Sequence, residues 1–505
     1  MVKLVKWGLY ALILTPLLYQ ASSLYPFLTL KVVVFQSLVE LLFAGYLYLA
    51  IFEPRFRPSP TPLLITFTAF IFVAFLTGWL GVDWRTSLWS FPERAIGTFG
   101  LLHFWAFFVM LVGLRDCPTI PFLLQSRNFG CGFAKKIREI ASNIAHFFRF
   151  ASLEISGFRN ESGLSDSLSG REIHWRHFIL CSFSVSLVTA MLAVFSGELR
   201  PGGVFGNPNF LSAYLLMNFF LGLYLLKMGL LEKHKWEILF LSLGLFLQFI
   251  TIFITQTRGV ILGFGCGLIF VFLSWLWRLS DNPISAAIQK FRLRLCKKNS
   301  RDYFQYRSFF SLRLARNFWI SQRKQIVGQS LWQKNKIWVV TAIIGLGLAL
   351  GGFWFSREAV FWKVIPGISR FTDFELQSAL PRLNAWEAGW QGFKERPLLG
   401  WGWDNFEKVV NKYYEPVKWR SRSGEVFFSK PHNIIIEYAI SGGLLLLLAF
   451  LSLIVTCFYE TKDIFLRGLI LAYLVPNLFS LDSFGVYLTL VIVLALIDIN
   501  FKKHV

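Results

Sequence analysis

Charged side chains are scarce in this chain. They make up 16% of its 505 residues, against roughly 25% in an ordinary soluble domain. Hydrophobic residues make up 55%, and phenylalanine alone occurs 55 times. A sequence of this composition cannot cover its apolar surface with polar groups, which excludes a soluble globular protein. We therefore expect lipid to cover much of the folded surface.

Cysteine is also scarce, and several familiar motifs are missing. The six cysteines form no C-x-x-C pair, and they stand at 117, 131, 181, 266, 296 and 457. This spacing excludes a disulfide framework and a cysteine metal site. The sequence has no zinc-site, helix-turn-helix or P-loop pattern either. Because membrane topology explains the net charge of +22, we predict no nucleic-acid partner.

What the sequence does contain is long apolar runs. A hydrocarbon core of ~30 Å needs ~20 apolar helical residues, and twelve segments approach this length: 7–25, 30–52, 62–82, 95–114, 177–196, 208–230, 236–255, 259–277, 337–355, 434–459, 464–480 and 484–500. These runs are too long and uniform for barrel strands. We therefore predict an all-α, polytopic integral membrane protein with about 12 transmembrane helices. The first run resembles a signal peptide, but the eleven later runs favour an uncleaved helix.

Lysine and arginine predict the orientation, because they gather in cytoplasmic segments. With the N-terminus inside, 34 of the 51 basic residues fall on the inner side and 16 on the outer side, while Lys31 falls within a span. We therefore predict a multi-pass protein of the cell (inner) membrane with cytoplasmic N- and C-termini. Its parts would be helices 1–4 in 1–114, a cytoplasmic loop at 115–176, helices 5–8 in 177–277, a basic cytoplasmic loop at 278–336, and a C-terminal part at 337–505 with an outer loop, 356–431, and helices 9–12.

The two cytoplasmic loops suit contact with anionic membrane lipids or docking of a partner. The outer loop is more informative, because a long loop in a compact bundle is usually functional. Its apolar residues recur at i, i+3, i+7 and i+10, which predicts a helix: Leu383, Trp386, Trp390 and Phe393. Pro381 suits the first turn of this helix and Pro397 ends it. The "GWGW" run at 400–403 predicts a tight turn with tryptophans at the membrane interface.

The candidate chemical groups lie on the predicted outer side. One histidine, His432, stands at the mouth of the span 434–459, and four arginines stand at span mouths or on the loop helix: Arg94, Arg200, Arg258 and Arg382. The guanidinium fork matches phosphate, so this combination predicts a site for a lipid-linked phosphate. Each residue also has a simpler interpretation, because arginines at helix ends snorkel to headgroups and a histidine before a helix can cap it.

Several motifs follow one another in a fixed order: "SLWSFPERAIGTFG", "RPGGVFGNPNFLSAYL", "TQTRGVILG", "PRLNAWEAGWQGFKERPLLGWGWDNF" and "PHNIIIEYAISGGLL". Together with the span count and the long loop before "PHN", this set resembles the O-antigen ligase and polymerase family of bacterial cell-surface polysaccharide enzymes. The sequence departs from the family at Ser441, where relatives often carry an acidic residue.

The resemblance implies a membrane glycosyltransferase of the GT-C type with an undecaprenyl-pyrophosphate-linked glycan as donor. It implies a metal-independent, inverting reaction without a cofactor, in which Arg258 and Arg382 bind the pyrophosphate and His432 assists the acceptor hydroxyl as base. Further substrate-binding residues would be Arg94, Arg200, Asn207 and Asn433. The residue types suit this chemistry, because fixed positive charge stabilises a leaving pyrophosphate and an imidazole can accept a proton near neutral pH.

Several alternatives stay open on the sequence alone. A surface polysaccharide polymerase and a protein O-oligosaccharyltransferase share the donor chemistry, so the acceptor could be a glycan, a lipid or a protein. Asp373 and Glu375 in "TDFE" could serve a metal-dependent enzyme instead. A polysaccharide or lipid transporter or flippase would show charged residues at mid-bilayer, whereas the spans contain few, such as Lys31 and Glu40.

Overall fold

The structure is a computed structural model. It describes residues 1–91, 96–114, 175–232, 234–276, 355–356, 359, 380–415 and 429–502. Within these ranges the regular structure is helical and no strand occurs. This agrees with the predicted all-α class.

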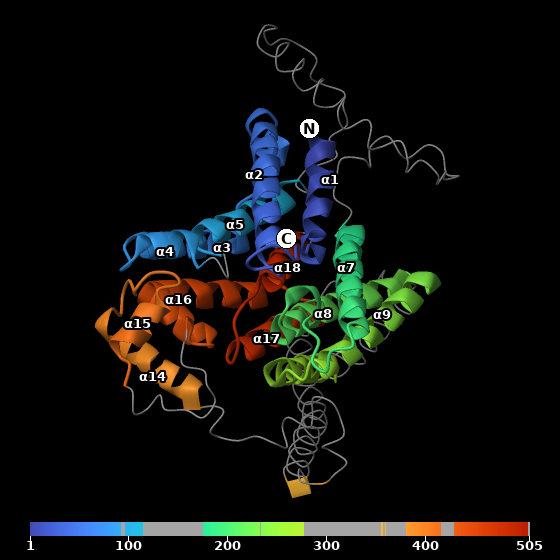
Figure 1. Cartoon of the computed structure of the whole chain (residues 1–505). Coiled ribbons are helices and arrows are strands. Elements are labelled where there is room, and N and C mark those ends of the chain that lie inside the picture. Colours follow the sequence, from blue (N-terminus) through green and yellow to red (C-terminus); the bar gives the residue numbers. More distant parts are fainter. Residues whose placement is uncertain are drawn as a thin grey trace, which may run out of the picture.

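The N-terminal half contributes nine α-helices (Figure 1), counted over its described part. They are α1 (Val2–Ile13), α2 (Thr29–Phe52), α3 (Pro62–Trp79), α4 (Trp84–Trp89), α5 (Thr98–Gly113), α7 (Trp175–Phe195), α8 (Pro208–Glu232), α9 (Lys235–Ile254) and the helix Arg258–Leu276. The C-terminal part contributes α14 (Leu380–Glu395), α15 (Phe406–Lys412), α16 (Ile434–Glu460), α17 (Ile464–Asn477) and α18 (Phe484–Lys502). Short 3-10 turns occur at η1 (Thr15–Leu17), η2 (Pro54–Phe56) and η5 (Gly203–Phe205).

Eight helices of the described residues are long and apolar enough to cross a membrane. They are Thr29–Phe52, Pro62–Trp79, Trp175–Phe195, Pro208–Glu232, Lys235–Ile254, Arg258–Leu276, Ile434–Glu460 and Phe484–Phe501. All eight coincide with predicted spans within a few residues, and the chain is a multi-pass membrane protein. Two further predicted spans correspond to shorter apolar helices, Thr98–Gly113 and Ile464–Asn477. The predicted span 337–355 lies outside the described residues, apart from Phe355.

The predicted first span, 7–25, is wrong in its bounds. Helix α1 begins at Val2 and ends at Ile13, and η1 follows with Pro16 near its start. Proline lacks a backbone N–H and its ring opposes continuation of a helix. The chain after η1 therefore leaves the helix and returns through a connection to Thr29, the first residue of α2.

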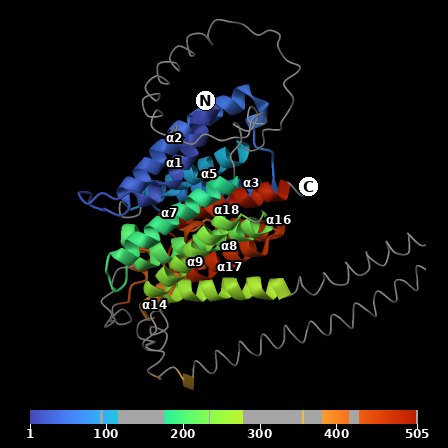
Figure 2. The same ribbon diagram turned by 90° about the vertical axis from the view of Figure 1, so that its right-hand side faces the viewer.

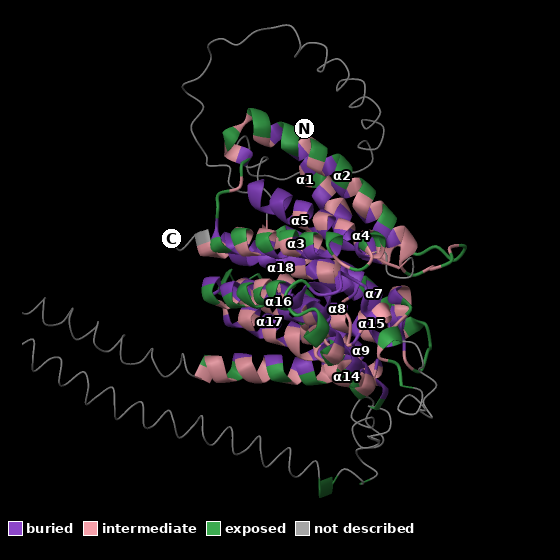
Figure 3. Cartoon of the chain, turned by 90° about the vertical axis from the view of Figure 1, so that its left-hand side faces the viewer, coloured by how far each residue is buried: buried purple, intermediate pink, exposed green. Residues whose placement is uncertain are grey.

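The long helices lie side by side in one bundle (Figure 2). Helix α16 packs along α3, while α8 contacts α7, α9, α17 and α18. Residues 491–497 of α18 are all buried (Figure 3), as expected for a helix that is apolar on every side. Helix α9, by contrast, exposes Trp236, Leu243 and Phe246. Such exposed apolar faces fit a protein whose outer solvent is lipid.

Several loops gather at one end of the bundle, on the left in Figure 2. The α1–α2 connection, the α7–α8 connection and α14 lie there, and the C-terminus lies at the other end. We call the end of the bundle that carries these loops the α14 end. It carries the residues of the predicted site.

Helix α16 breaks at two consecutive glycines near its middle. Gly442 and Gly443 have non-helical backbone angles, and Gly443 has a φ of 61°, which only glycine adopts readily. The loop after α14 fills the break: Trp401 N–H donates to the carbonyl of Ile440 at 2.7 Å, Gly402 N–H to Ser441 at 2.9 Å, and Leu444 N–H to Pro397 at 2.7 Å. The broken helix thus recovers its hydrogen bonds from the loop.

The "GWGW" run therefore makes a tight turn, as predicted, but its tryptophans are buried inside the protein rather than exposed on its surface. Trp401 and Trp403 are 5% and 1% exposed. Their indole N–H groups donate to the carbonyls of Gly392 at 2.9 Å and Ile96 at 3.2 Å. The turn is part of the packed interior because it supplies the backbone partners of the break in α16.

Candidate active site

The predicted histidine lies at the entrance of α16. Asn433 is the N-cap of this helix, because its Oδ1 accepts the N–H groups of Ile435 at 3.0 Å and Ile436 at 3.2 Å. His432 precedes the cap and is half-buried, with a φ of 53°. Few residues other than glycine adopt this left-handed conformation. The helix cap is therefore Asn433 rather than His432.

Helix α14 is fixed against this entrance. Trp386 Nε1 donates to the carbonyl oxygen of Pro431 at 2.8 Å. Gly389 lies so close to α16 that a Cβ there would come within 2.8 Å of Ile436. Arg382 is half-buried and one turn before Trp386, so both project from the same side of α14. This arrangement places Arg382 on the helix that contacts the histidine segment.

The predicted loop helix is confirmed, and the structure shows which of its faces is buried. Small residues face the protein: Pro381, Ala385, Ala388, Gly389 and Gly392 are buried. Leu383 and Trp390 are 43% and 58% exposed. Small residues allow helices to approach closely, and this packing leaves the large apolar side chains on the outside.

A second group forms where the chain before α8 meets the start of the helix Arg258–Leu276. Arg200 Nε donates to the carbonyl of Thr255 at 3.3 Å. Thr257 Oγ1 donates to Oδ1 of Asn209 at 3.2 Å. Arg258, the next residue, is half-buried. The structure thus brings the motifs "RPGGVFGNPNF" and "TQTRGV" together.

Two predicted substrate-binding residues are asparagines at helix starts. Asn207 Oδ1 accepts the N–H of Asn209 at 2.8 Å, and Asn433 Oδ1 caps α16. Asparagine is among the preferred residues for this role. Both side chains therefore use their carbonyl oxygens to stabilise helices, which leaves their amide N–H groups as the atoms that could contact a substrate.

The two groups approach each other at Phe479, in the connection between α17 and α18. The rings of Phe479 and Trp386 lie 6.4 Å apart between centroids. A Cβ added to Gly259 would lie 3.9 Å from the Cβ of Phe479. Phe479 thus lies between Gly259, the residue after Arg258, and Trp386, which bonds to Pro431 beside His432. The predicted residues form two neighbouring groups at the α14 end.

Three residues named from the sequence lie outside the described residues: Arg94, Asp373 and Glu375. Across the parts of the chain that the structure describes, no group of three histidine, cysteine, aspartate or glutamate side chains is placed to hold a metal ion. The metal alternative therefore still depends on Asp373 and Glu375.

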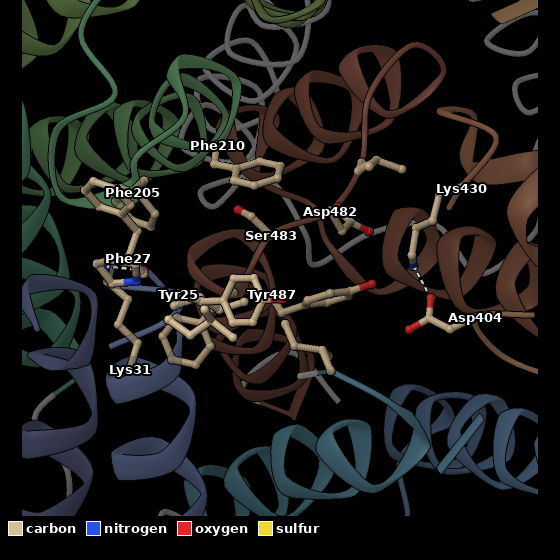
Figure 4. A pocket seen from close by; sticks show the side chains of 16 residues that line it. Tyr25, Phe27, Lys31, Phe205, Phe210, Asp404, Lys430, Asp482, Ser483 and Tyr487 are labelled. Carbon is tan, nitrogen blue, oxygen red and sulfur yellow. Dashed lines mark hydrogen bonds and ion pairs between the residues drawn. The ribbon is translucent and has the colours of Figure 1, made fainter. Parts of the chain in front are cut away.

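A cavity of about 250 Å³ opens at the same end of the bundle (Figure 4). Aromatic side chains form much of its wall: Tyr25, Phe27, Phe205, Phe210 and Tyr487. Its charged side chains are Lys31, Asp404, Lys430 and Asp482. None of these was predicted as a site residue.

Lys430 is the centre of the charged side of the cavity. Its Nζ lies 2.8 Å from Oδ1 of Asp404 and 2.9 Å from Oε1 of Glu437. The Lys430 side chain is 13% exposed and that of Asp404 is 1% exposed. Ser90 Oγ also donates to Oδ2 of Asp404. Paired charges of this kind can be buried because each compensates the other.

Asp482 lies in the connection between α17 and α18 and lines the same side of the cavity as Lys430 (Figure 4). Tyr473 donates its hydroxyl to Oδ2 at 2.9 Å, and Asn477 Nδ2 donates to Oδ1 at 2.8 Å. Burial raises the pKa of Asp482 to about 6, while these hydrogen bonds and the nearby charge of Lys430 act in the opposite direction. The carboxyl is therefore poised to change charge under mildly acidic conditions.

Lys31 lies at the other end of the cavity. It belongs to the first turn of α2, is 1% exposed and donates to the carbonyls of Phe27, at 2.7 Å, and Val204. Its position in a predicted span was the signal available in the sequence, because a lysine in an apolar run requires a polar partner. Asp404 and Lys430 had a weaker signal, since Asp404 lies within a motif quoted above and Lys430 directly precedes another.

One comparison with known proteins gives a match. Residues 314–451 match the family model described as O-Antigen ligase. This range includes α14, α15 and the first part of α16, and therefore Arg382, Asp404, Lys430 and His432. The match confirms the resemblance that the ordered motifs predicted. A comparison with curated proteins gave no match.

Proposed function

We propose that this chain, which belongs to the O-antigen ligase family through residues 314–451, transfers a glycan from an undecaprenyl-pyrophosphate carrier to an acceptor hydroxyl. The family match supports a membrane glycosyltransferase in general. The carrier, the inner-membrane location and the cytoplasmic termini are parts of the proposal. The α14 end would face the outside of the cell, in keeping with the excess of basic residues assigned to the inner side.

The observation that carries the proposal is the meeting of two groups at Phe479. One group contains arginines that suit a pyrophosphate, Arg258 and Arg200, and the other contains Arg382 and His432. A guanidinium binds phosphate oxygens with two parallel hydrogen bonds. Donor binding would therefore use the arginines, and Arg94 would join them.

The reaction follows from these positions. The acceptor oxygen attacks the anomeric carbon of the donor glycan, and its proton passes to the imidazole of His432. A new C–O bond forms as the bond between the anomeric carbon and the pyrophosphate breaks. The electron pair of the broken bond leaves with the lipid pyrophosphate, whose negative charge the arginines stabilise. Attack from the face opposite the leaving group inverts the anomeric centre.

The proposed chemistry requires no metal ion, because guanidinium groups supply the positive charge. A polymerase or a protein O-oligosaccharyltransferase would use the same donor steps with another acceptor. The transporter alternative is less well supported. A transporter was expected to carry charged residues at mid-bilayer, and two were named within spans. Lys31 lines the cavity at the α14 end, and Oε1 of Glu40 lies 3.0 Å from Nε2 of His103.

Deletion of the gene tests the proposal. Surface glycans of the deletion strain are separated on a gel beside those of the parent and of a strain with the gene restored. We expect loss of glycan-capped lipid. Loss of chain length alone would indicate a polymerase, and loss of one glycoprotein would indicate a protein-glycosylating enzyme. Unchanged surface glycans would contradict all three.

A further inference from the structure

We propose that the cavity beside Lys430 is the acceptor site and that it takes one sugar ring bearing free hydroxyl groups. This inference rests on the proposed function, because it names the acceptor of that reaction. It assigns Asp404, Asp482 and Lys430 to acceptor binding (Figure 4).

The cavity leads toward the histidine. A smaller cleft adjoins it and shares the side chains of Lys430, Asp482 and Tyr487. Asn433, which follows His432, lines this smaller cleft. A ring in the cavity would therefore place its hydroxyls near the N-cap of α16, the residue next to His432.

The charges of the cavity suit hydroxyl groups better than a pyrophosphate. Asp404 and Asp482 offset Lys31 and Lys430, and none of the described residues that line the cavity is an arginine. Carboxylates accept hydrogen bonds from hydroxyls, lysine donates to them, and tyrosine can do either. A dianionic pyrophosphate would be repelled by both carboxylates. The cavity therefore suits an uncharged acceptor, whereas the arginine group suits the charged donor.

The size and the aromatic wall indicate a single ring. A volume of about 250 Å³ lies just below the ~300–1,000 Å³ of sites for drug-sized molecules. Phe205, Phe210 and Tyr487 offer flat apolar surfaces. Asp404, Lys430 and Asp482 gather at one side, and Lys31 lies at the other end near Phe205. A sugar ring has such a division, with C–H groups on its faces and hydroxyls at its edge. The remainder of the acceptor would extend out of the cavity.

The first experiment measures occupancy without depending on transfer. Ser483 lines the cavity, so a Ser483→Cys variant, reconstituted in nanodiscs, is labelled with a small neutral thiol reagent and the modified peptide is quantified by mass spectrometry. The probes are methyl glycosides of glucose, galactose and N-acetylglucosamine, with cyclohexylmethanol and geranyl pyrophosphate for comparison. We expect at least one glycoside, and neither comparison compound, to slow the labelling.

Adding Asp482→Asn to this variant should weaken protection by about tenfold or more, because a hydrogen bond to a charged group is lost. The matched control is Asp83→Asn, which alters a carboxylate–lysine pair outside the cavity lining, Asp83 with Lys408 at 2.7 Å. Protection by geranyl pyrophosphate would place the donor in the cavity and overturn the proposal. The proposal would also be overturned if no glycoside protected the cysteine, or if Asp482→Asn left the protection unchanged.

The second experiment uses the proposed activity. Proteoliposomes receive donor and acceptor fractions extracted from the deletion strain, and each fraction is titrated against a fixed amount of the other. In Asp482→Asn, the half-saturating amount of acceptor should rise about tenfold or more, while that of donor stays unchanged. A rise for the donor alone would overturn the assignment. Absence of transfer by the wild-type protein would contradict the proposed function, and the labelling result would still decide what the cavity binds.

Discussion

The indole N–H of Trp386 donates to the carbonyl oxygen of Pro431 at 2.8 Å, one residue before His432. This bond joins the loop helix α14 to the entrance of the transmembrane helix α16. Arg382 lies one turn before Trp386 on the same side of α14. A change at Trp386 would therefore displace both Arg382 and the histidine segment, so the two residues are best tested by substitutions that leave this contact intact.

His432→Asn tests the role of the histidine. Asparagine tolerates the left-handed backbone found at this position, with its φ of 53°, so the fold should be kept. An amide cannot accept a proton at neutral pH, and loss of a general base costs ~10²–10⁴-fold in rate. Transfer by the variant should fall by that factor while donor binding persists. His234→Asn, at the exposed start of α9, is the control, and equal transfer by both variants would leave His432 without a catalytic role.

Arg258→Lys and Arg382→Lys test the binding of the pyrophosphate. Lysine keeps the charge but loses the planar fork that binds two phosphate oxygens. We expect each variant to lower transfer by about tenfold or more, with weaker binding of the lipid donor. Arg85→Lys, at an exposed position of α4, should behave as the wild type. Near-normal transfer by both candidate variants would indicate that these arginines only contact lipid headgroups.

The orientation can be tested with single cysteines in a variant that lacks the six native ones. Asn411 is exposed on α15, at the end of the bundle proposed to face outward, and Lys235 is exposed at the start of α9. Asn411→Cys should react with an impermeant thiol reagent in intact spheroplasts, and Lys235→Cys only after lysis. The reverse pattern would invert the topology and contradict the proposed site.

Chelation tests metal independence. Transfer by the purified protein should continue in EDTA, because arginines supply the positive charge at the pyrophosphate. The measurement is transfer with EDTA, followed by addition of magnesium or manganese. Activity that EDTA abolishes and either metal restores would favour Asp373 and Glu375 as metal ligands. Alanine variants of those two residues would then be compared with Arg258→Lys.

Asp482 should make stability depend on pH. Its pKa rises from 3.8 to about 6 in the fold, so between these values the folded protein holds a proton that the unfolded chain has lost. The free energy of unfolding should therefore decrease as pH rises from about 4 to about 6. Tyr473, Lys430 and Glu437 surround the carboxyl. Asp482→Asn should remove this decrease and raise the Tm at pH 7, as followed by thermal unfolding in detergent.

Asp83→Asn is the matched control for that series. Its hydrogen bond from Lys408 lowers the pKa of Asp83 to about 2, which gives the opposite sign. Stability from this carboxylate is present above pH 4 and is lost as pH falls toward 2. The Asn variant should therefore have a lower Tm at neutral pH. A Tm difference between Asp482→Asn and wild type that stays constant from pH 4 to 7 would contradict the assignment of Asp482.

The sequence predicted the helices well where composition alone decides them. A long apolar run in lipid can satisfy its backbone only as a helix, so spans such as Pro208–Glu232 were found within a few residues. It failed at α1, because the hydropathy of 7–25 does not show that the chain stops being helical before Pro16. For α14 the periodicity predicted the helix but left open whether its apolar face meets lipid or protein; in the structure small residues face the protein.

The candidate site divides in a similar way. His432 and the arginines were found because rare polar residues at span mouths are conspicuous in an apolar sequence. The cavity could not be found from the sequence, because its walls come from connections that are far apart in the chain. Tyr25, Phe205 and Asp482 are examples of residues in these connections. Only the packing of α2, α8 and α18 brings these residues together. Pairing of Lys430 with Asp404 likewise depends on where the loop after α14 docks.

That docked loop also has a consequence for how the protein is made. Three backbone hydrogen bonds at the break of α16 come from residues 397–402, and an unsatisfied backbone group in hydrocarbon costs several kcal/mol. Helix α16 can therefore not reach its final shape by insertion alone. The preceding loop must already have folded back onto the helix. Folding of this region is then a coupled event, in which a loop that fails to dock leaves backbone groups of α16 unsatisfied.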